Sequence, residues 1–164
     1  MSSKERPLFR SAMFVAIEND RGEVLLQRRA NTGFLDGHWD LSATGHLEYG
    51  ESMQTCGVRE AEEEVGLTVR EKDLEVVALF QTAFEPGIRY VNTIFRCRLW
   101  QGDPVIGEPT KIAELGWFAP ENFPDKLTVG ARVYLMSLGN QAARNYYIGP
   151  DEYREMMGAG YEGA

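Results

Sequence analysis

Cysteine, histidine and positive charge are all in short supply in this sequence. Its 164 residues include two Cys and two His, and 17 Lys and Arg face 25 Asp and Glu, which gives a net charge of -8. Cys56 and Cys97 make no disulfide framework and lack metal-ligand spacing, so we expect a reducing, cytoplasmic setting. An acidic surface repels phosphate backbones, which argues against a broad nucleic-acid-binding face. A local site with a bound metal could still accept a small phosphorylated ligand.

Long apolar runs are also missing. No stretch is long enough to cross a bilayer, and residues 1–7 carry no apolar signal segment, so we expect no membrane association. The length and the hydrophobic fraction of 43% suit a single globular domain. We expect this domain to span residues 1–164, with flexible tails at 1–7 and from about 150 to 164.

Strand-type segments dominate the first two thirds of the chain. The predicted strands cover residues 9–18, 24–29, 39–43, 74–84, 89–100 and 114–119. Turn-forming residues between neighbouring strands predict two hairpins, over residues 9–29 and 74–100.

Two helices are predicted among these strands. The first covers residues 52–65, where Ser52 is a suitable N-cap and Gly66 can end the helix in a left-handed conformation. The second covers residues 128–141, where apolar residues recur at helical spacing. This order of elements predicts an α/β fold in which helices cover a mixed sheet.

The helix at 52–65 carries three carboxylates on one face. At 100° per residue, Glu60, Glu63 and Glu64 fall together, whereas Glu62 points away. Like charges at this spacing destabilise a helix by roughly a few tenths of a kcal/mol per pair. A hard divalent cation offsets that repulsion and prefers carboxylate oxygens. Three Glu alone would equally fit a solvated acidic helix.

The surrounding segment GHLEYGESMQTCGVREAEEEVGL, from Gly45 to Leu67, favours the metal site. It resembles the Nudix box, G-x5-E-x7-R-E-U-x-E-E-x-G-U, in which U is a bulky aliphatic residue. All seven fixed positions are filled, by Gly45, Glu51, Arg59, Glu60, Glu63, Glu64 and Gly66. Leu67 fits the last aliphatic position, and the smaller Ala61 fills the other. At about one in fifteen per fixed position, seven chance matches at one start are of order one in 10⁸.

The resemblance implies the Nudix fold, an α/β/α sandwich with a mixed sheet in which the box forms a loop-helix-loop. Members of the family typically hydrolyse a nucleoside diphosphate linked to another moiety, often with Mg²⁺ or Mn²⁺. It therefore implies an enzyme that cleaves a pyrophosphate bond in a nucleoside di- or triphosphate derivative, and the short chain favours a small nucleotide. Dimers are frequent in the family, so a homodimer is also allowed.

The resemblance also assigns metal ligands. Glu60 and Glu64 would be the main ligands, and the Gly45 carbonyl a further one. Glu63 would bind a second metal ion or a metal-bound water. Metal ions would neutralise the polyanionic substrate and lower the pKa of a bound water.

Other residues would support the chemistry. By the same resemblance, Arg59 and Glu51 would brace the helix and orient its carboxylates. The family often places the general base in a loop outside the box, and our candidate is Glu108, with Glu114 as the alternative. Both could equally be surface glutamates in a polar loop.

The candidate substrate-binding residues are Arg29, Glu48 and His46. Family members commonly carry an Arg at the end of the second strand, and only one of the neighbours Arg28 and Arg29 can face inward. His46 directly follows Gly45, although a structural hydrogen bond would also explain a loop histidine.

Aromatic side chains could stack on a base, although in a sheet protein they more often belong to the core. The three tryptophans are Trp39, Trp100 and Trp117. Phe84, Tyr90 and Trp117 are the first to test.

Two other functions are compatible with a box of this kind. Residues 39–46 also look like isopentenyl-diphosphate isomerases, which use a catalytic cysteine upstream of the box, but no Cys precedes Cys56 here. A nucleotide-sensing module without turnover would be expected to lose box carboxylates, and this sequence keeps all of them.

Overall fold

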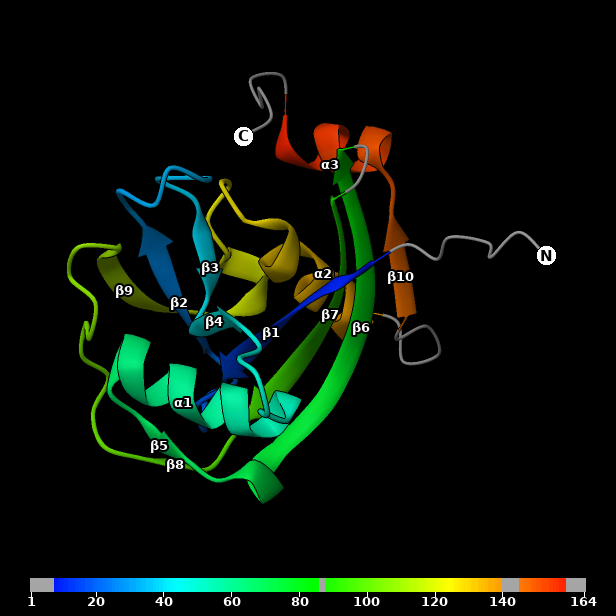
Figure 1. Cartoon of the computed structure of the whole chain (residues 1–164). Coiled ribbons are helices and arrows are strands. Elements are labelled where there is room, and N and C mark those ends of the chain that lie inside the picture. The colour runs from blue at the N-terminus through cyan, green and yellow to red at the C-terminus, as the bar shows by residue number, and fades with distance from the viewer. Residues whose placement is uncertain (1–7, 86–87, 140–144, 159–164) are drawn as a thin grey trace.

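A computed structural model describes residues 8–85, 88–139 and 145–158. Its largest sheet is mixed and has five strands in the order β10-β6-β7-β1-β4 (Figure 1). These strands are β1 (Arg10–Ile17), β4 (Ala43–His46), β6 (Leu74–Glu85), β7 (Ile88–Cys97) and β10 (Asn145–Ile148). β1 runs parallel to β7 and β10 runs parallel to β6, whereas the other pairs are antiparallel. The mixed sheet and the hairpin of β6 and β7 are confirmed.

A second, antiparallel sheet has the order β3-β2-β9, with β2 (Val24–Arg29) between β3 (Trp39–Leu41) and β9 (Ile112–Phe118). Two short strands, β5 (Thr68–Val69) and β8 (Trp100–Gln101), pair separately. The predicted hairpin over 9–29 is wrong, because β1 and β2 belong to different sheets and share only the bridge between Glu18 and Val24. The turn at 19–22 does form, but β1 pairs along its length with β7 and β4, so it belongs to the large sheet and not to a hairpin with β2.

Helix α1 (Met53–Val65) agrees with the prediction at both ends. The Ser52 side chain accepts a hydrogen bond from the Thr55 N–H at 3.0 Å, and Gly66 ends the helix with a φ of 68°. The later helix, α2 (Val129–Gly139), begins one residue after the predicted start, and residues 140–141 of the predicted range lie outside the described residues. Single-turn 3₁₀ helices cover Glu71–Asp73 and Pro120–Asn122. None of the helices in the described ranges is long and apolar enough to cross a membrane.

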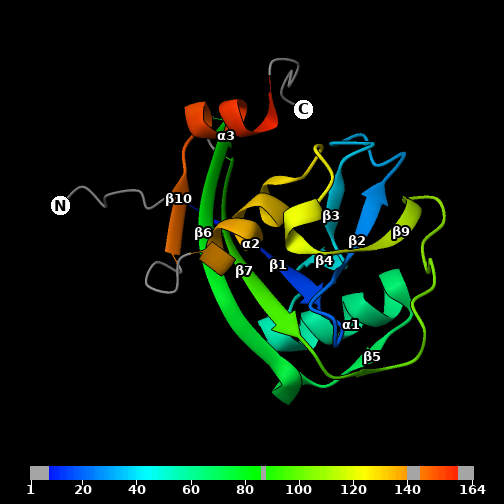
Figure 2. The ribbon, with the colours of Figure 1, turned by 180° about the vertical axis from the view of Figure 1, so that it is seen from behind.

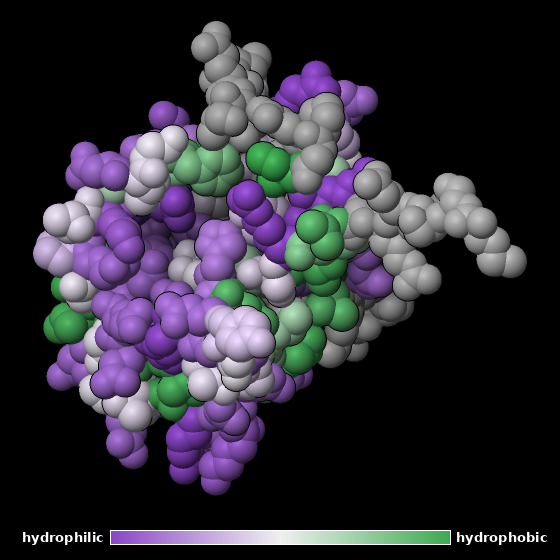
Figure 3. Space-filling model, viewed as in Figure 1, coloured by the Kyte–Doolittle hydropathy of each residue, from purple (hydrophilic) through white to green (hydrophobic). Residues whose placement is uncertain are grey.

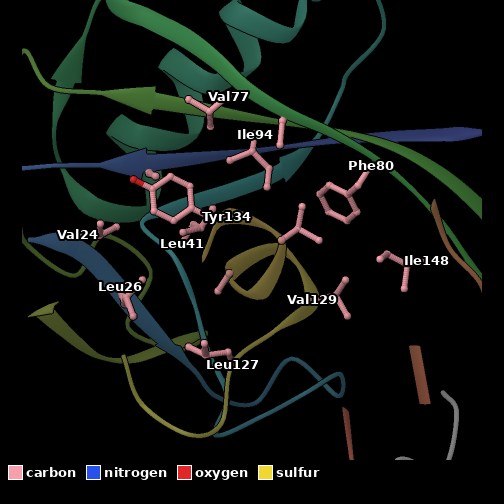
Figure 4. Packing of buried hydrophobic residues seen from close by; sticks show 14 of the residues in the cluster. Val24, Leu26, Leu41, Val77, Phe80, Ile94, Leu127, Val129, Tyr134 and Ile148 are labelled. Atoms are coloured by element: carbon pink, nitrogen blue, oxygen red, sulfur yellow. The ribbon is translucent and has the colours of Figure 1, made fainter. Parts of the chain in front are cut away.

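The alternation of side chains along β1 builds two cores, one on each face of the sheet. Met13, Val15 and Ile17 pack with residues of α1, whereas Ala16 packs with residues of α2. Figure 1 shows α1 on one side of the sheet, and the reversed view in Figure 2 shows α2 on the other. Figure 4 shows the core on the α2 side, where Tyr134 lies among side chains from several strands. The layers therefore form the predicted α/β/α sandwich.

The C-terminal part of the chain differs from the expected tail. Residues 150–157, which we expected to be flexible, form helix α3 (Pro150–Met157) after strand β10. Pro150 occupies the first turn, where its missing N–H costs no hydrogen bond, and Tyr153 is buried against the core. Burial of Tyr153 and pairing of β10 with β6 stabilise a segment whose own periodicity is weak.

Candidate active site

One arginine of α1 binds three glutamates. Arg59 donates from Nε and Nη2 to the two oxygens of Glu51, at 2.7 and 3.1 Å. Its Nη1 donates to Oε1 of Glu60 at 2.8 Å and to Oε2 of Glu63 at 3.1 Å. These hydrogen bonds lower the pKa of Glu51 to about 2 and raise that of Arg59. Arg59 therefore holds the carboxylates in place and offsets part of their mutual repulsion.

Glu64, the third carboxylate of the face, is buried rather than solvated. Its Oε2 accepts hydrogen bonds from Nε2 of Gln27 at 2.9 Å and from the Thr44 N–H at 2.7 Å. Burial raises the pKa of Glu64 to about 8, although both hydrogen bonds act in the opposite direction. The sequence placed Glu64 on the correct face but gave no sign of its burial against β2 and β4.

The loop before β9 is attached to the carboxyl end of α1. The Val105 N–H donates to the Val65 carbonyl at 3.0 Å, and the Gly107 N–H donates to the Glu64 carbonyl at 2.9 Å. A methyl group at Gly107 would overlap the Glu63 carbonyl, so only glycine allows this approach. The loop thereby brings residue 108 beside the helix face.

Glu108 lies next to the carboxylate face. Burial is the main reason that the pKa of Glu60 is raised, and the charges of Glu63 and Glu108 add to the effect. Both oxygens of Glu108 accept hydrogen bonds from Nζ of Lys111, at 2.8 and 3.0 Å. The Lys111 ammonium balances one of the negative charges gathered here.

Glu114, the alternative base, points elsewhere. It forms an ion pair with Arg28 at 3.0 Å, and both side chains are largely exposed. Because successive strand residues point to opposite faces, Arg28 faces away from Gln27, the residue that binds Glu64. The structure therefore brings Glu108, and not Glu114, to the candidate site.

A pocket of about 500 Å³ opens beside the carboxylate face. Glu64, Gly45 and Gln27 line one part of it, and Arg29 and His46 also belong to its wall. Figure 3 shows hydrophilic side chains over α1 at the lower left, with hydrophobic ones along β6 on the right. The pocket thus joins a charged end to a more apolar interior.

Two predicted substrate-binding residues line this pocket, and one does not. Arg29 points inward, where its guanidinium donates to the Phe34 carbonyl at 3.0 Å and lies 3.6 Å from Asp40. Nε2 of His46 lies 3.0 Å from the Tyr90 hydroxyl, and Tyr90 also lines the pocket. Glu48 is exposed and outside the lining, and its backbone N–H donates to Glu51 at 3.0 Å.

Most of the predicted aromatic candidates belong to the core. Trp39 packs edge-on against Phe118, and Trp100 stacks on Trp117, with ring centroids 5.0 and 5.8 Å apart. None of the three tryptophans lines the pocket. The side chain of Phe84 lies outside the described residues.

Sequence reasoning missed a set of buried polar side chains in the pocket wall. They are Gln27, Asp40, Thr82, Asn92 and Thr128. Asp40 accepts hydrogen bonds from the Thr128 hydroxyl at 2.7 Å and from the Leu41 N–H at 2.9 Å. The sequence does carry a signal for them, namely single polar residues within otherwise apolar strands. Polar side chains are buried in such strands only when they are paired or face a ligand, so these residues could have been predicted to line a site.

The carboxylates suit a hard divalent cation, although they do not form a complete coordination site in this conformation. Within the described ranges, no three His, Cys, Asp or Glu side chains are close enough to hold a metal ion together. Each of Glu60, Glu63 and Glu64 uses one oxygen for the bonds above, and its second oxygen accepts none from the described residues. Oxygen ligands are those that Mg²⁺ and Mn²⁺ prefer, so the chemistry of these carboxylates fits such a cation.

The sandwich and its arginine-bound carboxylates define a protein of the Nudix fold. A model of the NUDIX domain matches residues 8–138. The chain therefore belongs to the Nudix hydrolase family, enzymes that act on pyrophosphate bonds and generally use divalent metal ions.

Individual relatives agree with this assignment. "Uncharacterized Nudix hydrolase PA4841" of Pseudomonas aeruginosa is 37% identical over 65 residues, which make up 39% of this chain and only 38% of that protein. "Uncharacterized Nudix hydrolase YfcD" of Salmonella typhi is 28% identical over 148 residues, or 80% of this chain and 74% of that protein. A crystal structure of a MutT NUDIX hydrolase from Burkholderia pseudomallei is 27% identical with a TM-score of 0.71, and the match covers 82% of this chain and 99% of that one.

Proposed function

We propose that this protein hydrolyses a pyrophosphate bond in a nucleoside di- or triphosphate derivative, with Mg²⁺ or Mn²⁺ as cofactor. The observation that carries the proposal is the set of carboxylates held by Arg59 on the helix that also carries Glu64, which lines a 500 Å³ pocket. A polyanionic substrate would not approach such a cluster without cations, whereas a cation-loaded cluster would attract it.

Glu60 and Glu64, the Gly45 carbonyl and Glu63 would hold the metal ions. When bound, a divalent cation neutralises phosphate charge and makes a bound water more acidic. Glu64 supports this role, because a buried carboxylate with a raised pKa gains most from a nearby positive charge. Arg59 keeps the ligands oriented, and Glu51 in turn fixes Arg59 through two hydrogen bonds.

Glu108 would accept the proton of the attacking water. It lies on a loop fixed to the end of α1 and beside Glu60, so its carboxylate would lie close to a phosphate bound at the metal ligands. Nζ of Lys111 donates to both oxygens of Glu108 and would orient this carboxylate. Arg29 and His46, in the pocket wall, would contact the substrate.

Of the two alternatives, the isomerase draws less support from the structure. An isomerase would need a reactive cysteine, yet both Cys56 and Cys97 are buried and lie outside the pocket lining. Burial raises the pKa of Cys56 to about 12, so its thiol is a poor acid or nucleophile at neutral pH. A nucleotide sensor would bind ligand in the same pocket, and only turnover distinguishes it from an enzyme.

The test is a hydrolysis screen of the full chain with Mg²⁺, with Mn²⁺ and with EDTA. The panel contains nucleoside triphosphates, nucleotide sugars and dinucleotides, and coupled pyrophosphatase or alkaline phosphatase releases phosphate from the products. We expect metal-dependent turnover of at least one class and none with EDTA. Metal-dependent nucleotide binding without turnover of any class would instead make the protein a sensor.

A further inference from the structure

The β10–α3 segment lies outside the part of the chain that the family model matches. The NUDIX match ends at residue 138, whereas β10 and α3 cover 145–157. β10 extends the large sheet by pairing in parallel with β6, from Asn145 opposite Leu79 to Ile148 opposite Thr82. α3 then packs against β6 and α2, so the segment is fixed to the domain on two sides.

Tyr153 is the residue through which this segment enters the pocket. Its side chain is 2% exposed, lines the pocket and belongs to the same core cluster as Phe80. The neighbouring wall is aromatic, because the rings of Phe14 and Phe80 lie 5.5 Å apart. A methyl group at Gly130 would crowd the Phe14 ring, so a glycine at the start of α2 gives this wall its shape.

Polar groups border the aromatic wall. Asn92 and Thr82 are both buried and line the pocket, and their only mutual hydrogen bond is long, at 3.5 Å. An amide and a hydroxyl beside aromatic rings suit a flat group that has hydrogen-bonding edges and apolar faces. A nucleobase has this chemistry, because its two faces stack on aromatic rings and its edge carries hydrogen-bond donors and acceptors.

The pocket reaches from Glu64 on α1 to Tyr153 on α3. α1, which carries Glu64, and α3, which carries Tyr153, lie at opposite ends of the molecule in both Figure 1 and Figure 2. A ligand whose phosphates lie near Glu64 would therefore place its other end near Tyr153.

We infer that β10 and α3 form a specificity element in which Tyr153 closes the aromatic end of the pocket and selects the nucleobase of the substrate. The inference rests on the proposed function, because it assumes that the phosphates bind at the carboxylate end. Since the segment lies outside the family domain, it can set base preference without changing the catalytic residues.

The test measures binding by calorimetry in the presence of Mg²⁺. The ligands are the 5′-monophosphates of adenosine, guanosine, cytidine and uridine, with inorganic pyrophosphate as the ligand that lacks a base. We expect wild type to prefer one base, and Tyr153→Ala to weaken its binding by about tenfold while pyrophosphate affinity stays the same. Tyr153→Phe keeps the ring and should keep the preference, as should Glu155→Ala on the exposed side of α3.

Tyr153→Leu provides the second variant if the alanine substitution prevents folding, because it keeps much of the apolar volume without a ring. Equal loss of nucleotide and pyrophosphate binding in the folded leucine variant, or an unchanged base preference, would overturn the inference. Equal binding of all four nucleotides by the wild-type protein would also overturn the inference. Failure of the proposed function gives a different result, namely base-selective binding without hydrolysis.

Discussion

Gly45 lies directly against the carboxylate of Glu60, and a methyl group on Gly45 would overlap Oε1 of Glu60. Gly45 cannot move away easily, because it sits in β4 opposite Met13 of β1. Oε1 of Glu60 is oriented there by Arg59, whose Nη1 donates to it at 2.8 Å. The first glycine of the box therefore leaves the space that the carboxylate needs.

We predict that Gly45→Ala lowers kcat by about 10²-fold or more, because a displacement of Glu60 by about 1 Å misplaces a catalytic group. The melting temperature should change little, since the overlapping atom is the end of a flexible side chain. Gly139→Ala is the matched control, because a methyl group there meets nothing within 4 Å. A kcat for Gly45→Ala equal to that of the control would show that the position of Glu60 does not matter.

Glu64→Gln should reduce turnover by orders of magnitude while preserving the fold. The amide oxygen can still accept the hydrogen bonds from Gln27 and Thr44, but the negative charge is lost. Because burial raises the pKa of Glu64 to about 8, removing this charge should not lower the melting temperature measured without metal. The matched control, Glu62→Gln, changes an exposed side chain on the same helix and should leave both quantities unchanged. Near-normal rates for Glu64→Gln would contradict the metal assignment.

Local signals in the sequence predicted the box helix almost completely. Ser52 and Gly66 fix its ends through contacts with residues a few positions away, so their effect can be seen without the fold. The hairpin over 9–29 failed because the partners of β1 come from β4 and β7, the latter some eighty residues away along the chain. Propensity indicates that a strand forms but not which strand lies beside it.

The contrast between local signals and long-range contacts also explains which features of the candidate site could be predicted from the sequence. The spacing of Glu60, Glu63 and Glu64 already gave the face of the helix, because helix geometry relates sequence to position directly. The burial of Glu64 and the entry of Tyr153 into the pocket depend on elements that come together only in the folded chain. The roles of these residues in catalysis stay predictions until variants are measured.

Glu108→Gln should lower kcat by about 10²–10⁴-fold, the usual contribution of a general base. The loop should keep its place, because it is attached to α1 through backbone N–H groups of Val105 and Gly107. Glu114→Gln removes an equally acidic side chain from the other candidate position and should leave kcat near that of wild type, since its ion pair with Arg28 is exposed. Steady-state kinetics of both variants decide between Glu108 and Glu114. A large loss of kcat in Glu114→Gln with little change in Glu108→Gln would make Glu114 the base.

Asp40→Asn should change how stability depends on pH. Burial raises the pKa of Asp40 above its ordinary value of 3.8, and the nearby charge of Arg29 offsets only part of the effect. The folded state therefore binds this proton more tightly than the unfolded state, so Asp40 costs stability progressively as pH rises from about 4. The asparagine oxygen can still accept from Thr128 and Leu41. The melting temperature of Asp40→Asn relative to wild type should rise between pH 4.5 and neutrality in buffer with EDTA.

Asp36→Asn is the matched comparison, because the pKa of Asp36 is shifted the other way. Hydrogen bonds from the Thr32 side chain and backbone lower this pKa below 3.8. Asp36 thus stabilises the fold at pH values above its unfolded pKa, and this contribution is lost as pH falls through its folded pKa. Relative to wild type, Asp36→Asn should therefore become less stable as pH rises, the opposite of Asp40→Asn. Parallel pH profiles for the two variants would mean that burial of Asp40 does not govern its titration.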